Sequence, residues 1–257
     1  MGTAAVKECW RPKGKGTDMG QITRWTAAWA IACTAGTQAL AGFNAGGVNF
    51  MVTSSAGSAT TNFNGTELSA NSWAWTGSWS SNGASVSWNN LPSSSGEFSM
   101  ALAGNFVIRN ETASTQTFVI DVMMPGSFGN GTEWLVGGSA AASMVNLSPF
   151  TGNLTSSGPL WTASFDSNTV GSLFSGVNAA VDPFFTGSLA SQSFGNPIPG
   201  QPYTGGISSA ARIRLSLSLT AGMQATVTSS FAAQVVPGPG ALALIAVAAF
   251  GASRRRR

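Results

Sequence analysis

The stretch that decides the fold is residues 98–124, which reads FSMALAGNFVIRNETASTQTFVIDVMM. In each of its two halves the large apolar residues share one parity, with small or polar residues between them: Phe98, Met100, Leu102, Phe106 and Ile108, then Phe118, Ile120, Val122 and Met124. Successive side chains of a β-strand point to opposite faces, so this alternation predicts two strands that each bury one face. The polar segment 110–115 between them predicts a turn, and the whole stretch therefore predicts an antiparallel hairpin.

A second alternating stretch lies near the C-terminal end of the same region. Its apolar positions flank the turn 220–222: Ile213, Leu215, Leu217 and Leu219 before it, and Met223, Ala225 and Val227 after it. Arg212, Arg214, Ser216 and Ser218 take the opposite parity. This pattern predicts a second hairpin, again with one polar and one buried face.

Residues 42–234 as a whole predict one antiparallel β-sandwich of jelly-roll type. Gly, Ser, Thr and Asn interrupt short apolar runs about every ten residues, which is typical of a sandwich or barrel. Residues 164–206 contain Gly, Ser and Pro throughout and predict long loops or edge strands. No part of this region shows a convincing helical period.

Composition excludes several classes of function. The chain has no His, which removes Ser–His–Asp triads and His-ligated metals, and its two cysteines, Cys9 and Cys33, lie near the N-terminus. Its net charge of +3 hides unlike parts: the first 41 residues carry a net +3, the last four +4, and residues 42–253, with three Arg and seven acids, −4. A mildly acidic middle offers no basic stripe for phosphates, so we expect no nucleic-acid partner. We expect no cofactor.

Residues 1–41 predict a secretory signal peptide. Arg24 precedes the apolar run WTAAWAIACTA at residues 25–35, and Ala39 and Ala41 form an A-x-A site for signal peptidase before Gly42. Export by the Sec machinery follows from this prediction. Met19 is an alternative start, which would shorten the leader. The other interpretations are a buried helix of the mature protein and a lipoprotein signal at Cys33.

Residues 235–257 predict a short membrane anchor followed by a basic end. The apolar run at 241–253 has 13 residues, or roughly 20 Å of helix, which is short of a bilayer core of about 30 Å. Counted from Val235 the run has 19 residues, or roughly 28 Å, which just spans. Arg254, Arg255, Arg256 and Arg257 would stay on the cytoplasmic side.

This tail resembles the PEP-CTERM sorting signal of Gram-negative and related bacteria. In that family a V-P-E-P box precedes a short apolar helix and a terminal Arg cluster. Here the box corresponds to Val236, Pro237, Gly238 and Pro239, with Gly238 in place of the Glu. The resemblance implies that a membrane protease-transpeptidase, exosortase, cleaves near the box and passes the protein to the cell surface. The alternative is a plain one-span anchor.

A row of tryptophans is the clearest candidate for ligand binding. Trp73, Trp75 and Trp79 have even spacing and would share a face of one strand. If exposed, they could stack on sugar rings; if buried, they would fill the sandwich, and we favour core or half-buried packing. Four Asn-x-Thr triplets, at Asn64, Asn110, Asn130 and Asn153, are interpreted as turns first.

The seven acids of the middle region are scattered, and no pair is indicated by spacing. Without a D-x-D-x-D pattern we expect no calcium or other metal site. The leading hypothesis is a non-enzymatic, surface-sorted structural or adhesive protein of the cell surface or exopolysaccharide matrix, anchored transiently in the inner membrane. The alternatives are a carbohydrate-binding module that uses the tryptophan row, and a hydrolase whose two acids meet in space.

Overall fold

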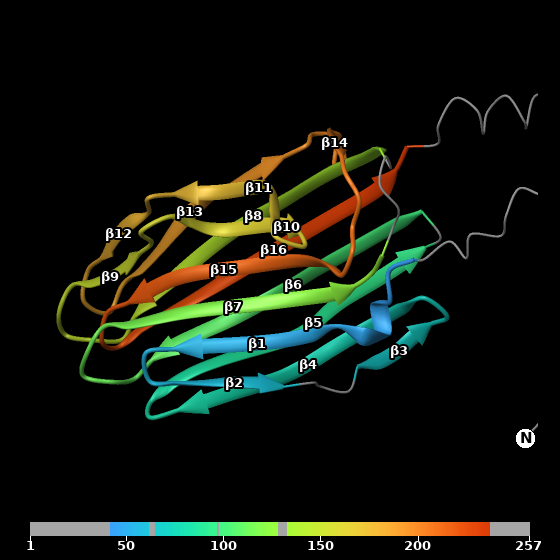
Figure 1. Ribbon diagram of the computed structural model, residues 1–257. Helices are drawn as coiled ribbons and strands as arrows, with labels where there is room; N and C mark the ends of the chain where they lie inside the picture. The colour runs from blue at the N-terminus through green and yellow to red at the C-terminus, as the bar shows by residue number, and fades with distance from the viewer. Residues whose placement is uncertain (1–41, 62–64, 97, 128–132, 237–257) are drawn as a thin grey trace, which may run out of the picture. The chain divides into compact units, whose positions relative to one another are not determined.

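The computed structural model describes residues 42–61, 65–96, 98–127 and 133–236, and these form two antiparallel β-sheets (Figure 1). Within the described residues the first sheet runs β11 (Asn168–Ser175), β10 (Pro159–Phe165), β15 (Ala210–Leu219), β7 (Gln116–Pro125), β1 (Asn49–Ser54) and β2 (Gly57–Thr61). Two short strands extend it: β9 (Gly152–Thr155), which pairs with β15, and β12 (Asn178–Val181), which pairs with β9.

The second sheet is built around the long last strand of the described chain. Its order is β13 (Thr186–Phe194), β8 (Glu133–Asn146), β16 (Met223–Val235), β6 (Ser99–Asn110), β5 (Ala84–Gly96), β4 (Ser72–Ser81) and β3 (Thr66–Ser69), and β14 (Gln201–Thr204) also pairs with β8. A short 3-10 helix, η2 (Ala45–Gly47), precedes β1. The prediction of an all-β, antiparallel fold is confirmed.

The two sheets pack face to face around one core. Phe50 of β1 stacks on Trp88 of β5 with 5.1 Å between ring centroids, and Trp161 of β10 donates a 2.9 Å hydrogen bond to Ser229 of β16. Both contacts cross from one sheet to the other. The buried hydrogen bond matters because an indole N–H without a partner in an apolar core is costly. The described residues therefore form a β-sandwich.

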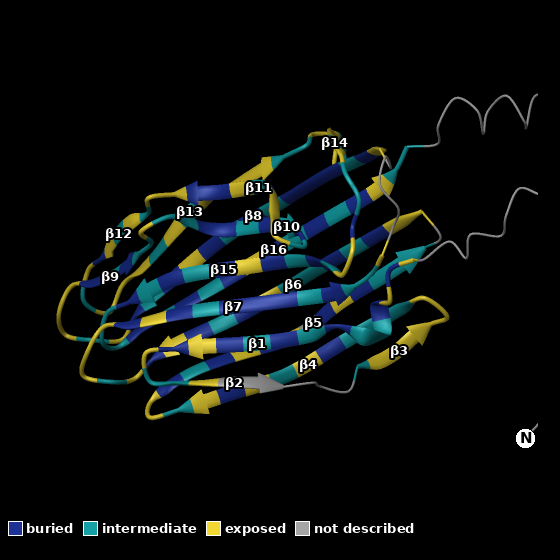
Figure 2. Cartoon of the chain, in the orientation of Figure 1, coloured by how far each residue is buried: buried dark blue, intermediate teal, exposed yellow. Residues whose placement is uncertain are grey.

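The alternation seen in the sequence fixes which face each strand buries (Figure 2). Buried in the core are Met100, Leu102, Phe106 and Ile108 of β6, Phe118, Ile120, Val122 and Met124 of β7, Ile213, Leu215, Leu217 and Leu219 of β15, and Met223, Ala225 and Val227 of β16. Phe98 differs, because it lies in the turn before β6 and is partly exposed. The segment 164–206 supplies β11 and β13, which close the edges of the two sheets, as predicted.

Both predicted hairpins are wrong in their pairing. β6 lies in the second sheet and β7 in the first, and β15 and β16 are divided between the sheets in the same way. Each turn is an arch that carries the chain across the core, so the two apolar faces oppose each other. A hairpin would have placed these faces side by side in one sheet. The alternation is the same in both arrangements.

The two arches are tied together by the buried side chain of Asn110. Its amide donates to the carbonyl oxygens of Ser114 (2.7 Å) and Leu219 (2.8 Å), and its oxygen accepts from the backbone N–H (3.0 Å) and the hydroxyl (2.7 Å) of Thr112. Its backbone carbonyl accepts from Gly222. All its hydrogen-bonding capacity is therefore used inside the turn, as the interpretation of this Asn-x-Thr triplet anticipated.

We expect the substitution Asn110→Ala to lower the free energy of unfolding by about 2–3 kcal/mol, since it leaves buried backbone groups without partners. Urea denaturation followed by tryptophan fluorescence measures the loss. Asn178→Ala, at an exposed position of β12, is the matched control and should change stability by less than about 0.5 kcal/mol. Equal losses in both variants would contradict this role of Asn110.

Candidate functional site

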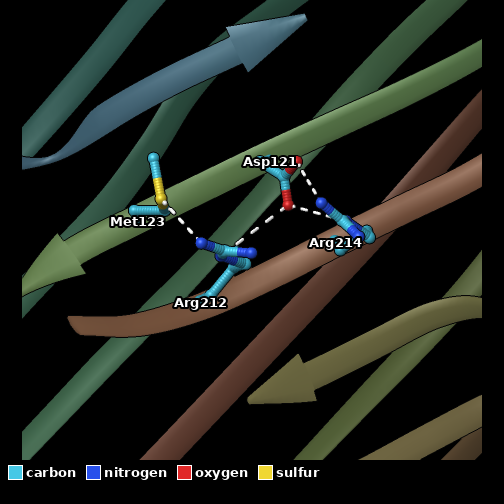
Figure 3. A network of polar contacts seen from close by, with 4 residues as sticks. All are labelled: Asp121, Met123, Arg212 and Arg214. Atoms are coloured by element: carbon cyan, nitrogen blue, oxygen red, sulfur yellow. Dashed lines mark hydrogen bonds and ion pairs between the residues drawn. The ribbon is translucent and has the colours of Figure 1, made fainter. Parts of the chain in front are cut away.

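The outer face of the first sheet carries a group of charged side chains (Figure 3). Because Ala211, Ile213 and Leu215 of β15 point into the core, Arg212 and Arg214 point outward. The pairing of β15 with β7 places Arg214 directly opposite Asp121. Asp121 is flanked on its other side by Met51 of β1. The sheet thus brings together charges that lie about ninety residues apart in the sequence.

Arg214 and Asp121 form a two-bonded ion pair. Arg214 Nε donates to Asp121 Oδ1 and Arg214 Nη2 to Asp121 Oδ2, both at 2.9 Å. Asp121 is fully buried, although it lies on the outer face of the sheet. The hydrogen bonds to Asp121 raise the pKa of Arg214, against an opposing effect of burial. This pair is the parallel, fork-like arrangement that makes Arg–carboxylate contacts strong.

Arg212 shares the same carboxylate but is held less well. Its Nε lies 3.8 Å from Asp121 Oδ1, and its Nη2 contacts the sulfur of Met123 at 3.4 Å. The Nε atom is buried and has no hydrogen-bond partner among the described residues. Two guanidinium groups therefore share one carboxylate, and Arg212 retains donor capacity that the protein does not use.

Asp166 supplies the second carboxylate of this face. It follows β10 with a left-handed φ of 52°, and its two oxygens accept five hydrogen bonds, from the backbone N–H and hydroxyl groups of Ser208 and Ser209 and from the N–H of Ala210. Burial alone would raise the pKa of Asp166, but these hydrogen bonds outweigh it and hold the pKa well below its usual range. Asp166 is thus a fixed negative charge.

A cavity of about 490 Å³ opens between these groups. Its polar lining consists of Asn49, Asp166, Ser167, Ser209 and Arg212, and its apolar lining of Met123, Pro125 and Ala210. A smaller cavity of about 100 Å³ adjoins it, since Asp166, Ser167 and Arg212 line both. The volume falls in the range of small-molecule sites, of roughly 300–1,000 Å³. We call the larger one the Arg212 cavity.

The tryptophan row has a different setting from a binding face. Trp75 and Trp79 are buried, and only Trp73 keeps partial exposure. Trp75 donates a 2.8 Å hydrogen bond to Ser93, which donates in turn to the carbonyl of Ala45. The favoured interpretation, core or half-buried packing, is confirmed. Buried rings cannot stack on a sugar, so the three residues do not form a carbohydrate platform.

The predicted processing sites fall largely outside the described residues. This applies to Ala39 and Ala41, to Pro237, Gly238 and Pro239, and to the Arg cluster 254–257. Gly42 is the first described residue, and Val236 donates a 2.8 Å hydrogen bond to the carbonyl of Glu133. Val235 is the last residue of β16, so the longer helix length, which was counted from Val235, is wrong.

Within residues 42–61, 65–96, 98–127 and 133–236, no helix has the length and apolar character needed to cross a bilayer. The predicted signal helix and anchor helix both lie outside these ranges.

Sequence reasoning missed the Arg212 cavity. It placed Arg212 and Arg214 on a polar face and Asp121 on another, but it treated the acids as scattered. The available signal was the outward position of these charges in strands that otherwise alternate cleanly. That signal says which face the charges occupy, whereas the pairing of β7 with β15 decides that they meet.

Comparisons with known proteins give little further information. No family model matches the sequence, and no curated protein matches it. Among solved structures the chain is similar to the carbohydrate-binding module TmCBM61 in complex with beta-1,4-galactotriose, with 13% identity and a TM-score of 0.20 over 51% of this chain and 69% of that one. A TM-score this low carries no functional assignment.

The unequal partners of the two arginines lead to unequal expectations for stability. Arg214→Met leaves the buried carboxylate of Asp121 with only the 3.8 Å contact to Arg212, and we expect a loss of about 2–3 kcal/mol, reduced from that of a fully buried pair because Arg214 is partly exposed. Arg212→Met should cost less than about 1 kcal/mol. Urea unfolding of both variants tests this, and equal losses would contradict the assignment of Arg214 as the structural partner.

Proposed function

We propose that this protein is an exported, surface-sorted, non-enzymatic component of the cell surface or exopolysaccharide matrix. The C-terminal box and Arg cluster support the sorting step, because their order resembles an exosortase substrate. In this proposal the tail holds the protein transiently in the inner membrane until exosortase releases it. The leader would be removed by signal peptidase before Gly42.

The bounds of the sandwich support this proposal. The last strand, β16, ends at Val235, and the last described backbone hydrogen bond is that of Val236. At the other end, Phe43 forms the first bridge of the described chain, with Gly126. Cleavage before Gly42 and near Pro237 would therefore leave every described strand intact. A sorted protein needs a folded domain that survives both cuts.

The chemistry of the two carboxylates favours a non-enzymatic role over the hydrolase alternative. Glycoside hydrolysis needs a general acid with a raised pKa beside a second carboxylate. The pKa of Asp166 is instead lowered by its hydrogen bonds, so Asp166 is a poor proton donor at neutral pH. Asp121 is fully engaged by Arg214. Neither carboxylate at the Arg212 cavity is suited to the role of the acid.

We infer a jelly-roll scaffold for the domain from its strand order. From β6 onward the chain alternates between the sheets, and the strands β6-β16-β8-β13 face the strands β7-β15-β10-β11. Two interlocked Greek keys of eight strands produce this order. The hairpins β1–β2 and β4–β5, with β3, extend the two sheets at one side.

The sorting proposal is tested by the mass of the mature protein recovered from its native host, with and without exosortase. We expect removal of residues 1–41 in both strains, and removal of the tail beyond the box only when exosortase is present. An intact tail in both strains would contradict sorting and identify a plain membrane anchor.

A second candidate function is the binding of a neutral saccharide in the Arg212 cavity, in place of the tryptophan row. The cavity places the free donors of Arg212 near the carboxylate of Asp166, above an apolar patch of Met123 and Pro125. Asp121, Asp166, Arg212 and Arg214 together carry no net charge. Paired donors and acceptors beside an apolar surface suit a ring with hydroxyl groups on its rim and C–H groups on its face.

Calorimetric titration with the purified exopolysaccharide of the host tests this second function. We expect Arg212→Met to weaken binding about tenfold or more, which corresponds to about 1.4 kcal/mol, while it leaves the fold intact. Trp73→Phe is the matched control and should bind like the unaltered protein. Binding that Arg212→Met leaves unchanged, or that Trp73→Phe abolishes, would contradict this site.

A further inference from the structure

Four large apolar side chains lie exposed on two loops at one end of the sandwich. Leu147 and Phe150 belong to the β8–β9 loop and expose 56% and 76% of their surface, and Phe184 and Phe185 belong to the β12–β13 loop and expose 70% and 67%. We call these four residues the apolar tip. Figure 2 shows exposed loops at this end, beside β9 and β12. Single exposed apolar residues are ordinary, but a cluster of this kind indicates an interaction site.

The two loops of the apolar tip are joined by the buried side chain of Asn146. Its amide donates to the carbonyl oxygens of Phe150 (2.7 Å), Val181 (3.0 Å) and Asp182 (3.1 Å). Its backbone N–H donates to the carbonyl of Phe185 at 3.0 Å. One residue thus holds both loops together, and the exposed rings are carried on a fixed backbone.

The turn that presents Phe184 is strained. Phe185 N–H bonds to the carbonyl of Asp182 at 3.1 Å, Pro183 occupies the second position, and Phe184 has a φ of 62° in the third. This combination is that of a type II turn, whose third position favours Gly or Asn. A bulky ring at a left-handed φ, exposed to solvent, lowers stability without filling the core. Its presence therefore points to a role outside the fold.

The apolar tip lies at the opposite end of the domain from the C-terminal tail. The backbone N–H of Leu147 bonds to the carbonyl of Gly222, just before β16 begins. From there β16 runs 13 residues to Val235 (Figure 1), a length of about 40 Å at 3.3 Å per residue. A domain held by its tail would thus present the apolar tip away from the membrane that anchors it.

We propose that the apolar tip is a self-association surface that binds the apolar tip of a second copy of this chain. Three exposed Phe and one Leu offer roughly 500 Å² per copy, on the basis of about 200 Å² for each aromatic side chain. Two tips in contact would bury about 1,000 Å², the lower limit for a specific interface. Such a contact is weak for one pair and becomes effective when many copies are displayed together.

The chemistry of the apolar tip favours a second copy over other occupants. Phe and Leu side chains have no donors or acceptors, so they would leave the hydroxyl groups of a sugar without partners. The anchoring membrane lies at the other end of β16. Another copy offers an apolar surface of equal size and matching character, as a two-fold interface requires. Self-association is independent of the proposed sorting, whereas its use in adhesion between cells rests on it.

A bead-clustering assay tests the proposal. The full chain is attached to beads through its C-terminal end, and clustering is measured by light scattering as a function of protein density. We expect steep, density-dependent clustering, which the double variant Phe150→Ser/Phe185→Ser reduces at least tenfold. Leu68→Ser is the matched control, because Leu68 is similarly exposed, at 61%, but lies on β3. It should cluster like the unaltered chain.

Two further arms make the outcomes decisive. Phe184→Asn should raise the melting temperature, since Asn tolerates the left-handed φ, and yet reduce clustering. Beads of the unaltered chain should not recruit differently coloured beads of the double variant. No clustering of the folded chain, recruitment of double-variant beads, or clustering only after host polysaccharide is added would each overturn the proposal; the last would make the apolar tip a saccharide contact.

Discussion

The arrangement of both sheets depends on the buried side chain of Asn110. Its hydrogen bonds join the arch between β6 and β7 to the end of β15, and its backbone carbonyl accepts from Gly222 in the arch between β15 and β16. These two arches carry the chain between the central strands of the two sheets. Once they are fixed, the apolar faces oppose each other, and the core aromatic residues pack between them. The same end of the domain carries Asn146, which orders the loops of the apolar tip in a similar way. Two buried asparagines thus organise one end of the sandwich.

Local alternation predicts the strands and their buried faces well, but it does not predict their partners. The inward residues of β6, β7, β15 and β16 were all identified from parity, because a period of two holds whatever the neighbouring strand is. The two hairpins were wrong because a turn of a few polar residues can close a hairpin or an arch. The choice between them depends on the packing of distant strands across the core. The edge strands of residues 164–206 were anticipated because Gly, Ser and Pro are tolerated where one side of a strand is unpaired.

The functional surfaces were less predictable than the fold. Even spacing correctly placed the tryptophans on one face of β4, but spacing does not say whether that face meets solvent or the core. The Arg212 cavity forms because β7, β15 and the turn after β10 come together, and the apolar tip forms because Asn146 joins loops from two regions of the chain. Each site consists of residues that are unremarkable in sequence. The bounds of the sandwich, by contrast, lie within a few residues of the predicted processing points.

The central claim is that this sandwich functions outside the cell, at its surface. Antibody labelling of the domain on intact cells of the native host, compared with permeabilised cells, tests this claim most directly. The proposed export and sorting predict the same signal in both preparations, and a marked fall in the intact-cell signal when exosortase is absent. A signal that appears only after permeabilisation, in the presence of exosortase, would contradict the claim and place the domain inside the cell envelope.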